Sequence, residues 1–127
     1  MANKFGKKSL ERLRTCHDDL QLLCHAVLED MDITILCGHR GEKEQNEAFK
    51  AGNSQLKFPN SKHNSVPARA VDVAPYKAGV GVDWNDIEAF EKMCALFEQQ
   101  AEKMGIEIRL GRDFSFRDFP HIELKGK

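Results

Sequence analysis

The sequence has no apolar run close to the roughly 20 residues that a membrane-spanning helix needs. Residues 1–10 also lack the apolar stretch of a secretory signal peptide. The charged content of 31% argues further against a membrane protein. These absences predict synthesis in a cytoplasm and no direct insertion into a membrane.

The chain also lacks an excess of basic charge. Its 19 lysines and arginines nearly balance 20 aspartates and glutamates, which gives a formal net charge of -1. Proteins that bind nucleic acid usually carry a basic excess or stripe, so we expect no nucleic-acid partner. The basic segment at residues 4–8 is short, and we interpret residues 1–8 as a flexible, solvated N-terminus.

The four cysteines form no CxxC pair. Three of them lie in apolar patterns, so we expect small reduced core residues rather than disulfide partners or metal ligands. A length of 127 residues suits one domain, and 41% hydrophobic residues can form one core. We therefore predict a single domain over residues 1–127, without an attached cell-wall-binding module, and a monomer.

The first half of the chain predicts two helices around a strand. Apolar residues recur at steps of three and four over residues 9–31, which indicates one long amphipathic helix with Ser9 as its N-cap. The run Ile33–Cys37 is β-branched and apolar, as in a buried strand. A short helix is expected over residues 42–51 and is closed by Gly52.

The second half predicts strands at residues 70–74, 106–110 and 121–124. Between the first two of these lies a long amphipathic helix that ends at Gly105, with Asp83 as the expected N-cap. The early alternation of helices and strands would allow a parallel doubly wound sheet. The two closely spaced final strands fit an antiparallel end better, so we favour a small α+β domain with a mainly antiparallel sheet.

Asp72 is the unusual residue, because it lies inside the apolar run Ala70–Ala74. Burial of an unpaired carboxylate costs several kcal/mol, so a cation is expected beside it. With a histidine nearby at position 63, a metal ion is the strongest candidate. His121 could be a third ligand and Asp118 a general base. Taken singly, however, each of these side chains is more often a surface or hydrogen-bonding residue.

Three spaced motifs resemble one family of zinc peptidases. These are an SxH segment, an AxD strand, and an acidic residue three positions before a final histidine: Ser61-x-His63, Ala70-x-Asp72 and Asp118-x-x-His121. The sequence resembles the family of D-Ala-D-Ala carboxypeptidases, vancomycin-resistance dipeptidases and phage L-alanyl-D-glutamate endopeptidases. The resemblance extends from about Ile33 to Leu124 and implies a small α+β domain of the D,D-peptidase type with a zinc site at the sheet.

The resemblance implies a role for several residues. His63, Asp72 and His121 would bind Zn²⁺, and Asp118 would be the catalytic base. Arg40 would bind the substrate carbonyl or carboxylate and stabilise the developing oxyanion. Three further residues are expected to contact substrate or to orient the metal ligands through hydrogen bonds: Ser61, Gln45 and Asp113. Asp113 belongs to a Gly-Arg-Asp-Phe stretch that resembles the Gly-Gly-Asp-Trp stretch of the phage enzymes.

The sequence departs from the family pattern at two points. His63 and Asp72 are nine residues apart, whereas the common form of the pattern has seven. Such a loop extension costs little free energy, but it leaves the loop's own contacts open. The expected base is an aspartate where several family members use glutamate, and this feature favours the phage endopeptidases.

The favoured function is therefore a phage-type endolysin that cleaves the L-alanyl-D-glutamate bond of peptidoglycan stem peptides. It would accumulate in the host bacterial cytoplasm and act on the cell wall after release by a partner such as a holin. A D-Ala-D-Ala carboxypeptidase or dipeptidase is the alternative, because the same metal site serves either bond. A non-catalytic zinc-containing binding module is a remote third possibility.

Overall fold

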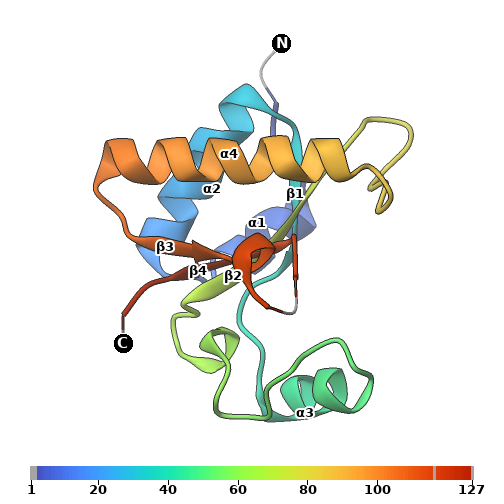
Figure 1. The fold of residues 1–127 in the computed structure, drawn as a ribbon, viewed down its shortest axis with the longest axis vertical. Helices are drawn as coiled ribbons and strands as arrows, with labels where there is room; N and C mark the ends of the chain where they lie inside the picture. The colour runs from blue at the N-terminus through green and yellow to red at the C-terminus, as the bar shows by residue number, and fades with distance from the viewer. Residues whose placement is uncertain (1–2, 116, 127) are drawn as a thin grey trace.

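The computed structural model describes residues 3–115 and 117–126 of the chain. They form a four-stranded antiparallel sheet in the order β1-β2-β4-β3, with helices packed on it (Figure 1). In chain order the elements are α1 (Lys7–Leu13), α2 (Asp18–Asp30), β1 (Ile33–Cys37), α3 (Glu42–Lys50), the short 3-10 turn η1 (Lys62–Asn64), β2 (Ala70–Pro75), α4 (Ile87–Met104), β3 (Ile108–Leu110), the 3-10 turn η2 (Gly111–Asp113) and β4 (His121–Leu124). The expected α+β fold with an antiparallel sheet is confirmed.

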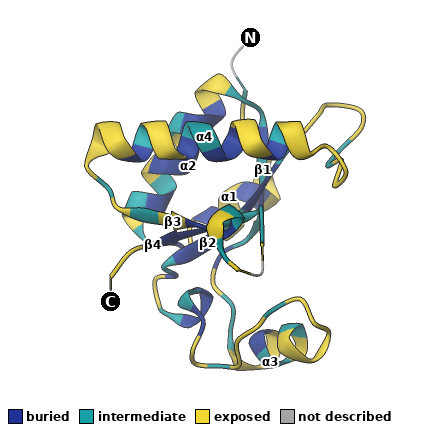
Figure 2. Cartoon of the chain, in the orientation of Figure 1, coloured by how far each residue is buried: buried dark blue, intermediate teal, exposed yellow. Residues whose placement is uncertain are grey.

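The alternation of side chains along the strands divides the sheet into two chemically different faces. Val71 and Val73 of β2 are fully buried in the core, and Ile122 and Leu124 of β4 join them. The intervening residues, among them Asp72, therefore point to the opposite face. Figure 2 shows the buried residues concentrated where the helices meet the sheet, while the outer surfaces of α3 and α4 are exposed.

Helices α2 and α4 pack on each other and supply much of the core. The apolar residues of α4 recur at helical spacing, and Phe90, Cys94 and Phe97 are buried. The helix begins at Ile87, because the Asp86 side chain accepts a hydrogen bond from the Ala89 backbone N–H at 3.1 Å. The expected N-cap, Asp83, instead caps the preceding turn.

The prediction of one helix over residues 9–31 is wrong, because the chain breaks between α1 and α2. The backbone at the break pairs with the loop before β2: Ala68 N–H donates to Thr15 O at 2.9 Å, and His17 N–H donates to Ala68 O at 2.8 Å. His17 then caps α2, and its ring Nδ1 accepts a bond from Asp19 N–H at 3.0 Å. The extended loop between His63 and Asp72 thus packs into this break.

Two described residues before α1 contact α2. The Asn3 side chain donates to Leu28 O at 2.9 Å, and the Phe5 ring lies edge-on to His25 at 5.2 Å between ring centroids. Ser9 is not the N-cap: it lies within α1, and its hydroxyl accepts a hydrogen bond from Ile35 N–H at 3.0 Å. This hydrogen bond joins helix α1 to strand β1.

All four cysteines are free, as expected. Cys16, Cys24 and Cys94 are buried in the core, whereas Cys37 is only partly buried at the end of β1. Among the described residues, no helix combines the length and apolarity that crossing a membrane would require.

Candidate active site

The register of the sheet places the predicted site residues on the face opposite the core. In the antiparallel pair β2–β4, Asp72 lies opposite His121, and Ala70 lies opposite Glu123. Because residues two apart share a face, His121, Glu123 and Asp72 all project to the same side. The motif residues of β2 and β4 meet through strand pairing alone.

His63 reaches this face from the turn η1. Ser61 is the N-cap of the turn, and its hydroxyl accepts a bond from His63 N–H at 3.2 Å. The Asn64 side chain closes the turn by accepting from Ser61 N–H at 3.0 Å. The His63 backbone O accepts from Arg40 N–H at 2.8 Å, which fixes the turn against the segment after β1. The imidazole is only 2% exposed.

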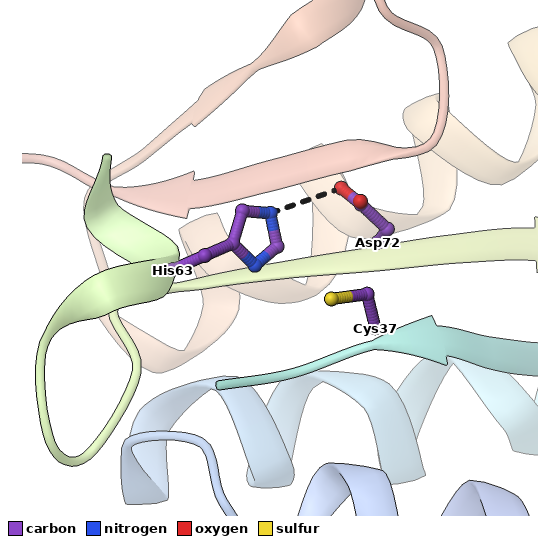
Figure 3. Close-up of side chains that lie close together, drawn as sticks. All are labelled: Cys37, His63 and Asp72. Atoms are coloured by element: carbon purple, nitrogen blue, oxygen red, sulfur yellow. Dashed lines mark hydrogen bonds and ion pairs between the residues drawn. The ribbon is translucent and has the colours of Figure 1, made fainter. Parts of the chain in front are cut away.

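Two imidazole rings converge on one carboxylate oxygen. His63 Nε2 lies 3.2 Å from Asp72 Oδ1, and His121 Nδ1 lies 3.4 Å from the same oxygen. Figure 3 shows the His63 ring directed at Asp72, with Cys37 beside them. The other ring nitrogens contact acceptors at 2.8 Å, namely Gly38 O for His63 and Glu123 Oε1 for His121.

This arrangement suits a metal ion. A neutral imidazole has one N–H, and donation to Gly38 or Glu123 turns the lone pair of the other nitrogen toward Asp72. Two lone pairs and a carboxylate that face one another repel unless a proton or a metal ion lies between them. Two imidazoles and one carboxylate also form a donor set that Zn²⁺ prefers in catalytic sites. The side chains of the chain therefore fit the zinc site that the motifs predict.

Two overlapping groups of potential ligand atoms surround Asp72. In each group the atoms lie within 4.8 Å of one another: Asp72, Asp118 and His121 in one, and Cys37, His63 and Asp72 in the other. The structure thus brings the three predicted ligands and the predicted base together.

The charges of the cluster depend strongly on one another. Burial opposes the protonation of His63, but the hydrogen bonds and the charges of Asp72 and Cys37 together outweigh it and raise the pKa of His63 to about 10. Burial likewise opposes the ionisation of Asp72, yet its bonds with His121 and His63 hold its pKa well below the usual value. In the metal-free protein, Asp72 is therefore ionised and His63 is positively charged.

Arg40 contacts the far side of the same carboxylate. Its Nη2 donates to Asp72 Oδ2 at 3.3 Å, and its Nη1 donates to Gln45 Oε1 at 3.1 Å. Gln45 is fully buried, and its amide nitrogen donates to Ser54 Oγ at 2.9 Å and to Leu56 O at 2.6 Å. Gln45 therefore connects the guanidinium to the loop after α3, which makes it a supporting residue of the site.

Asp118 is placed by a close contact with Gly111. Its backbone N–H donates to Gly111 O at 2.9 Å, and its own backbone O accepts from His121 N–H at 3.0 Å. A Cβ at position 111 would clash with the Asp118 backbone and would lie 2.8 Å from His121 Cβ. Burial and the negative charge of Asp72 together raise the pKa of the Asp118 carboxyl. A carboxylate with a raised pKa beside a metal site is suited to accept a proton.

The structure also contains neighbours that sequence reasoning missed. Cys37 was expected in the core, but a bulge in β1 turns it toward the site, where the register places it opposite Asp72. Burial opposes the ionisation of its thiol, but His63 and Arg40 lower its pKa overall. Glu123 could have been noticed, because it lies two residues after His121 and so faces the same side of a strand.

Asp113 is the predicted residue that the structure does not bring to the cluster. Its carboxylate accepts a hydrogen bond from Arg112 Nε at 3.2 Å, and 64% of its side chain is exposed. It is not among the described residues that line the cavity over the site.

A cavity of about 660 Å³ opens over the cluster. Arg40, His63, Asp72, Asp118 and His121 lie in its wall, together with Ser61. The remaining wall consists of the loop after α3 and of side chains from β3, β4 and the loop between them. The predicted ligands and the predicted base are therefore accessible from solvent through this cavity.

The chain is similar to known proteins over nearly its whole length. The family described as phage L-alanyl-D-glutamate peptidase matches residues 1–125. The L-alanyl-D-glutamate peptidase of Escherichia phage T5 is 38% identical, over 98% of this chain and 91% of that protein. The crystal structure of the Serratia marcescens L-Ala D-Glu endopeptidase ChiX superposes with a TM-score of 0.81 at 28% identity, over 97% of this chain and 91% of that chain. The chain therefore belongs to the phage L-alanyl-D-glutamate peptidase family.

Proposed function

We propose that this chain is a zinc-dependent endopeptidase that hydrolyses the L-alanyl-D-glutamate bond in peptidoglycan stem peptides. The family membership and the names of the two relatives support the choice of bond. The observation that carries the zinc chemistry is the convergence of His63 Nε2 and His121 Nδ1 on one oxygen of Asp72, with Asp118 beside them. The open cavity above this cluster supplies room for a peptide.

The residues of the site have separate roles in the proposed hydrolysis. His63, Asp72 and His121 would hold Zn²⁺, which when bound polarises the scissile carbonyl and lowers the pKa of water. Asp118 accepts a proton from the attacking water and then delivers it to the nitrogen of the leaving amine. Its raised pKa suits the first transfer, because burial and the charge of Asp72 favour the protonated carboxyl, and the same group must then release the proton to the leaving amine.

Arg40 supports the negative charge that develops on the carbonyl oxygen. Asp72 and Gln45 each accept one of its N–H groups, and a guanidinium has five donors in a fixed fork. The remaining donors are directed by the same two contacts, so little rearrangement is needed when substrate arrives. Ser61 contributes by capping the turn that carries His63.

The test of the bond is digestion of purified peptidoglycan, followed by mass spectrometry of the new termini. The proposal expects products with a new N-terminal D-glutamyl residue. Release of free D-alanine without such products would show a D,D-carboxypeptidase instead. Metal analysis of the purified chain should find about one zinc per chain, and chelation should abolish hydrolysis until zinc is restored. Full activity after thorough chelation would refute the metal mechanism.

A zinc-containing binding module remains distinguishable by the same digestion. Such a module would bind zinc and peptidoglycan but would release no peptide. The presence of Asp118 within ligand distance of the cluster favours the enzyme, because a binding module has no need of a base at that position.

A further inference from the structure

A second charged cluster lies on the site face of the sheet, at one wall of the cavity. Arg109 of β3 is directly opposite Glu123 of β4 in the strand register, and its Nη1 lies 3.5 Å from Glu123 Oε2. Its guanidinium carbon also lies 5.0 Å from the centre of the Phe114 ring. The side chain is 55% exposed and lines the cavity. Arg109 is thus held at two points while part of its fork faces the cavity.

The charge around Arg109 is positive on balance. Glu123 Oε2 forms ion pairs with Lys62 Nζ at 3.3 Å and with Arg109 Nη1, so one carboxylate is shared by two cations. Its other oxygen contacts His121 Nε2 at 2.8 Å. Arg117 also lines the cavity. Since the whole chain has a formal charge of -1, this positive wall is a local feature that favours an anionic group of the substrate.

The chemistry of the leaving residue supplies an anion at a suitable place. Its α-carboxylate carbon is two bonds from the scissile nitrogen, a distance of about 2.5 Å from standard backbone dimensions. A side chain that binds this carboxylate must therefore lie close to the metal ligands. Glu123 contacts both His121 and Arg109, so Arg109 is linked to the predicted zinc ligand His121 through a single side chain.

We propose that Arg109, oriented by Phe114 and Glu123, binds the α-carboxylate of the D-glutamyl residue on the leaving side of the scissile bond. A guanidinium fork matches a carboxylate through two parallel hydrogen bonds, and it gains less from a neutral carboxamide. Arg109 then determines whether the enzyme prefers stem peptides with a free α-carboxylate over peptides in which that group is amidated. This inference rests on the proposed function and names a specificity residue for it.

Two synthetic stem peptides test the proposal, identical except that one carries the α-carboxylate of D-glutamate and the other its α-carboxamide. The readout is the ratio of their kcat/KM values. Wild type should favour the carboxylate peptide by on the order of 10-fold to 100-fold, as expected for hydrogen bonds between charged groups. Arg109→Gln should bring the ratio near one. Arg109→Lys should give an intermediate ratio, because it keeps the charge and loses the fork.

The matched control is Arg14→Gln, which removes an exposed arginine outside the cavity and should keep the wild-type ratio. An equal fall of both rates in Arg109→Gln, with the ratio retained, would overturn the proposal, since it would show that Arg109 only supports Glu123 and His121. Loss of the preference in Arg117→Gln but not in Arg109→Gln would also overturn it. If wild type cleaved neither peptide, the proposed function would fail, and this inference with it.

Discussion

At the scale of single residues, Asp72 organises the site. One of its oxygens faces two imidazole nitrogens, and the other accepts from Arg40. A partly buried carboxylate with these neighbours is stabilised in its ionised form, which explains how a charge can occur between Val71 and Val73, both fully buried. The sequence pattern identified this residue because an aspartate in an apolar strand requires such partners.

Glu123 should determine which nitrogen of His121 binds the metal. Its carboxylate accepts a bond from Nε2, so the lone pair of Nδ1 remains available. We expect Glu123→Gln to weaken zinc affinity by roughly 10-fold to 100-fold. Competition with a coloured chelator measures this directly, without reference to catalysis. Glu102→Gln, an exposed change on α4, is the matched control, and unchanged affinity in Glu123→Gln would refute the role.

Asp118 should be needed for hydrolysis and not for metal binding. Asp118→Asn keeps the shape of the side chain and removes the proton acceptor. We expect kcat to fall by roughly 10²-fold to 10⁴-fold, the usual contribution of a general base. Zinc content and the far-UV spectrum should match wild type, and Asp30→Asn provides a surface control. Near-normal kcat in Asp118→Asn would assign the base to another residue.

At the scale of elements, strand pairing and one glycine contact position the chemistry. The β2–β4 register brings Asp72 opposite His121. The Gly111 backbone O accepts a hydrogen bond from Asp118 N–H, and this contact positions the loop before β4. Gly111→Ala would force that backbone away, because the new Cβ would lie 2.8 Å from His121 Cβ and still closer to the Asp118 carbonyl. We expect a loss of about 1–3 kcal/mol in the free energy of unfolding, as for other overpacked sites, and a clear fall in kcat.

The matched control for Gly111→Ala is Gly6→Ala, because a Cβ at Gly6 meets nothing within 4 Å. Urea unfolding of both variants gives the stability difference, and the same samples give kcat. Equal stability and activity in the two variants would mean that the loop before Asp118 moves freely enough to accept the methyl group.

The elements that sequence reasoning predicted well are those with local signals. The strands Ile33–Cys37 and His121–Leu124 have the predicted bounds, and the end of α4 at Gly105 followed from residue type. The break between α1 and α2 was missed because Ala68, distant in sequence, makes the hydrogen bonds that stabilise it. The orientation of Cys37 was missed for a similar reason, since a bulge in strand pairing has no local signature in this stretch.

At the scale of the whole molecule, the site couples stability to pH and to metal. In the metal-free protein the folded-state pKa of His63 is about 10, above the ordinary value of 6.5. The stability from its pairing with Asp72 is therefore complete below about pH 6.5 and is lost as the pH rises through about 10. Asp72 has a lowered pKa, so its contribution is present above about pH 4, the ordinary aspartate value, and is lost as the pH falls.

Metal-free protein should consequently lose stability between pH 6.5 and 10, by on the order of 1.4 kcal/mol for each unit of the His63 shift. Zinc should act in the opposite direction, because it binds the deprotonated imidazoles and its affinity rises over the same range. Urea unfolding at several pH values, with chelator and with saturating zinc, should give curves that diverge as the pH rises. His39→Gln, a change at an exposed histidine, should preserve the divergence. Parallel curves would mean that His63 does not exchange a proton for the metal.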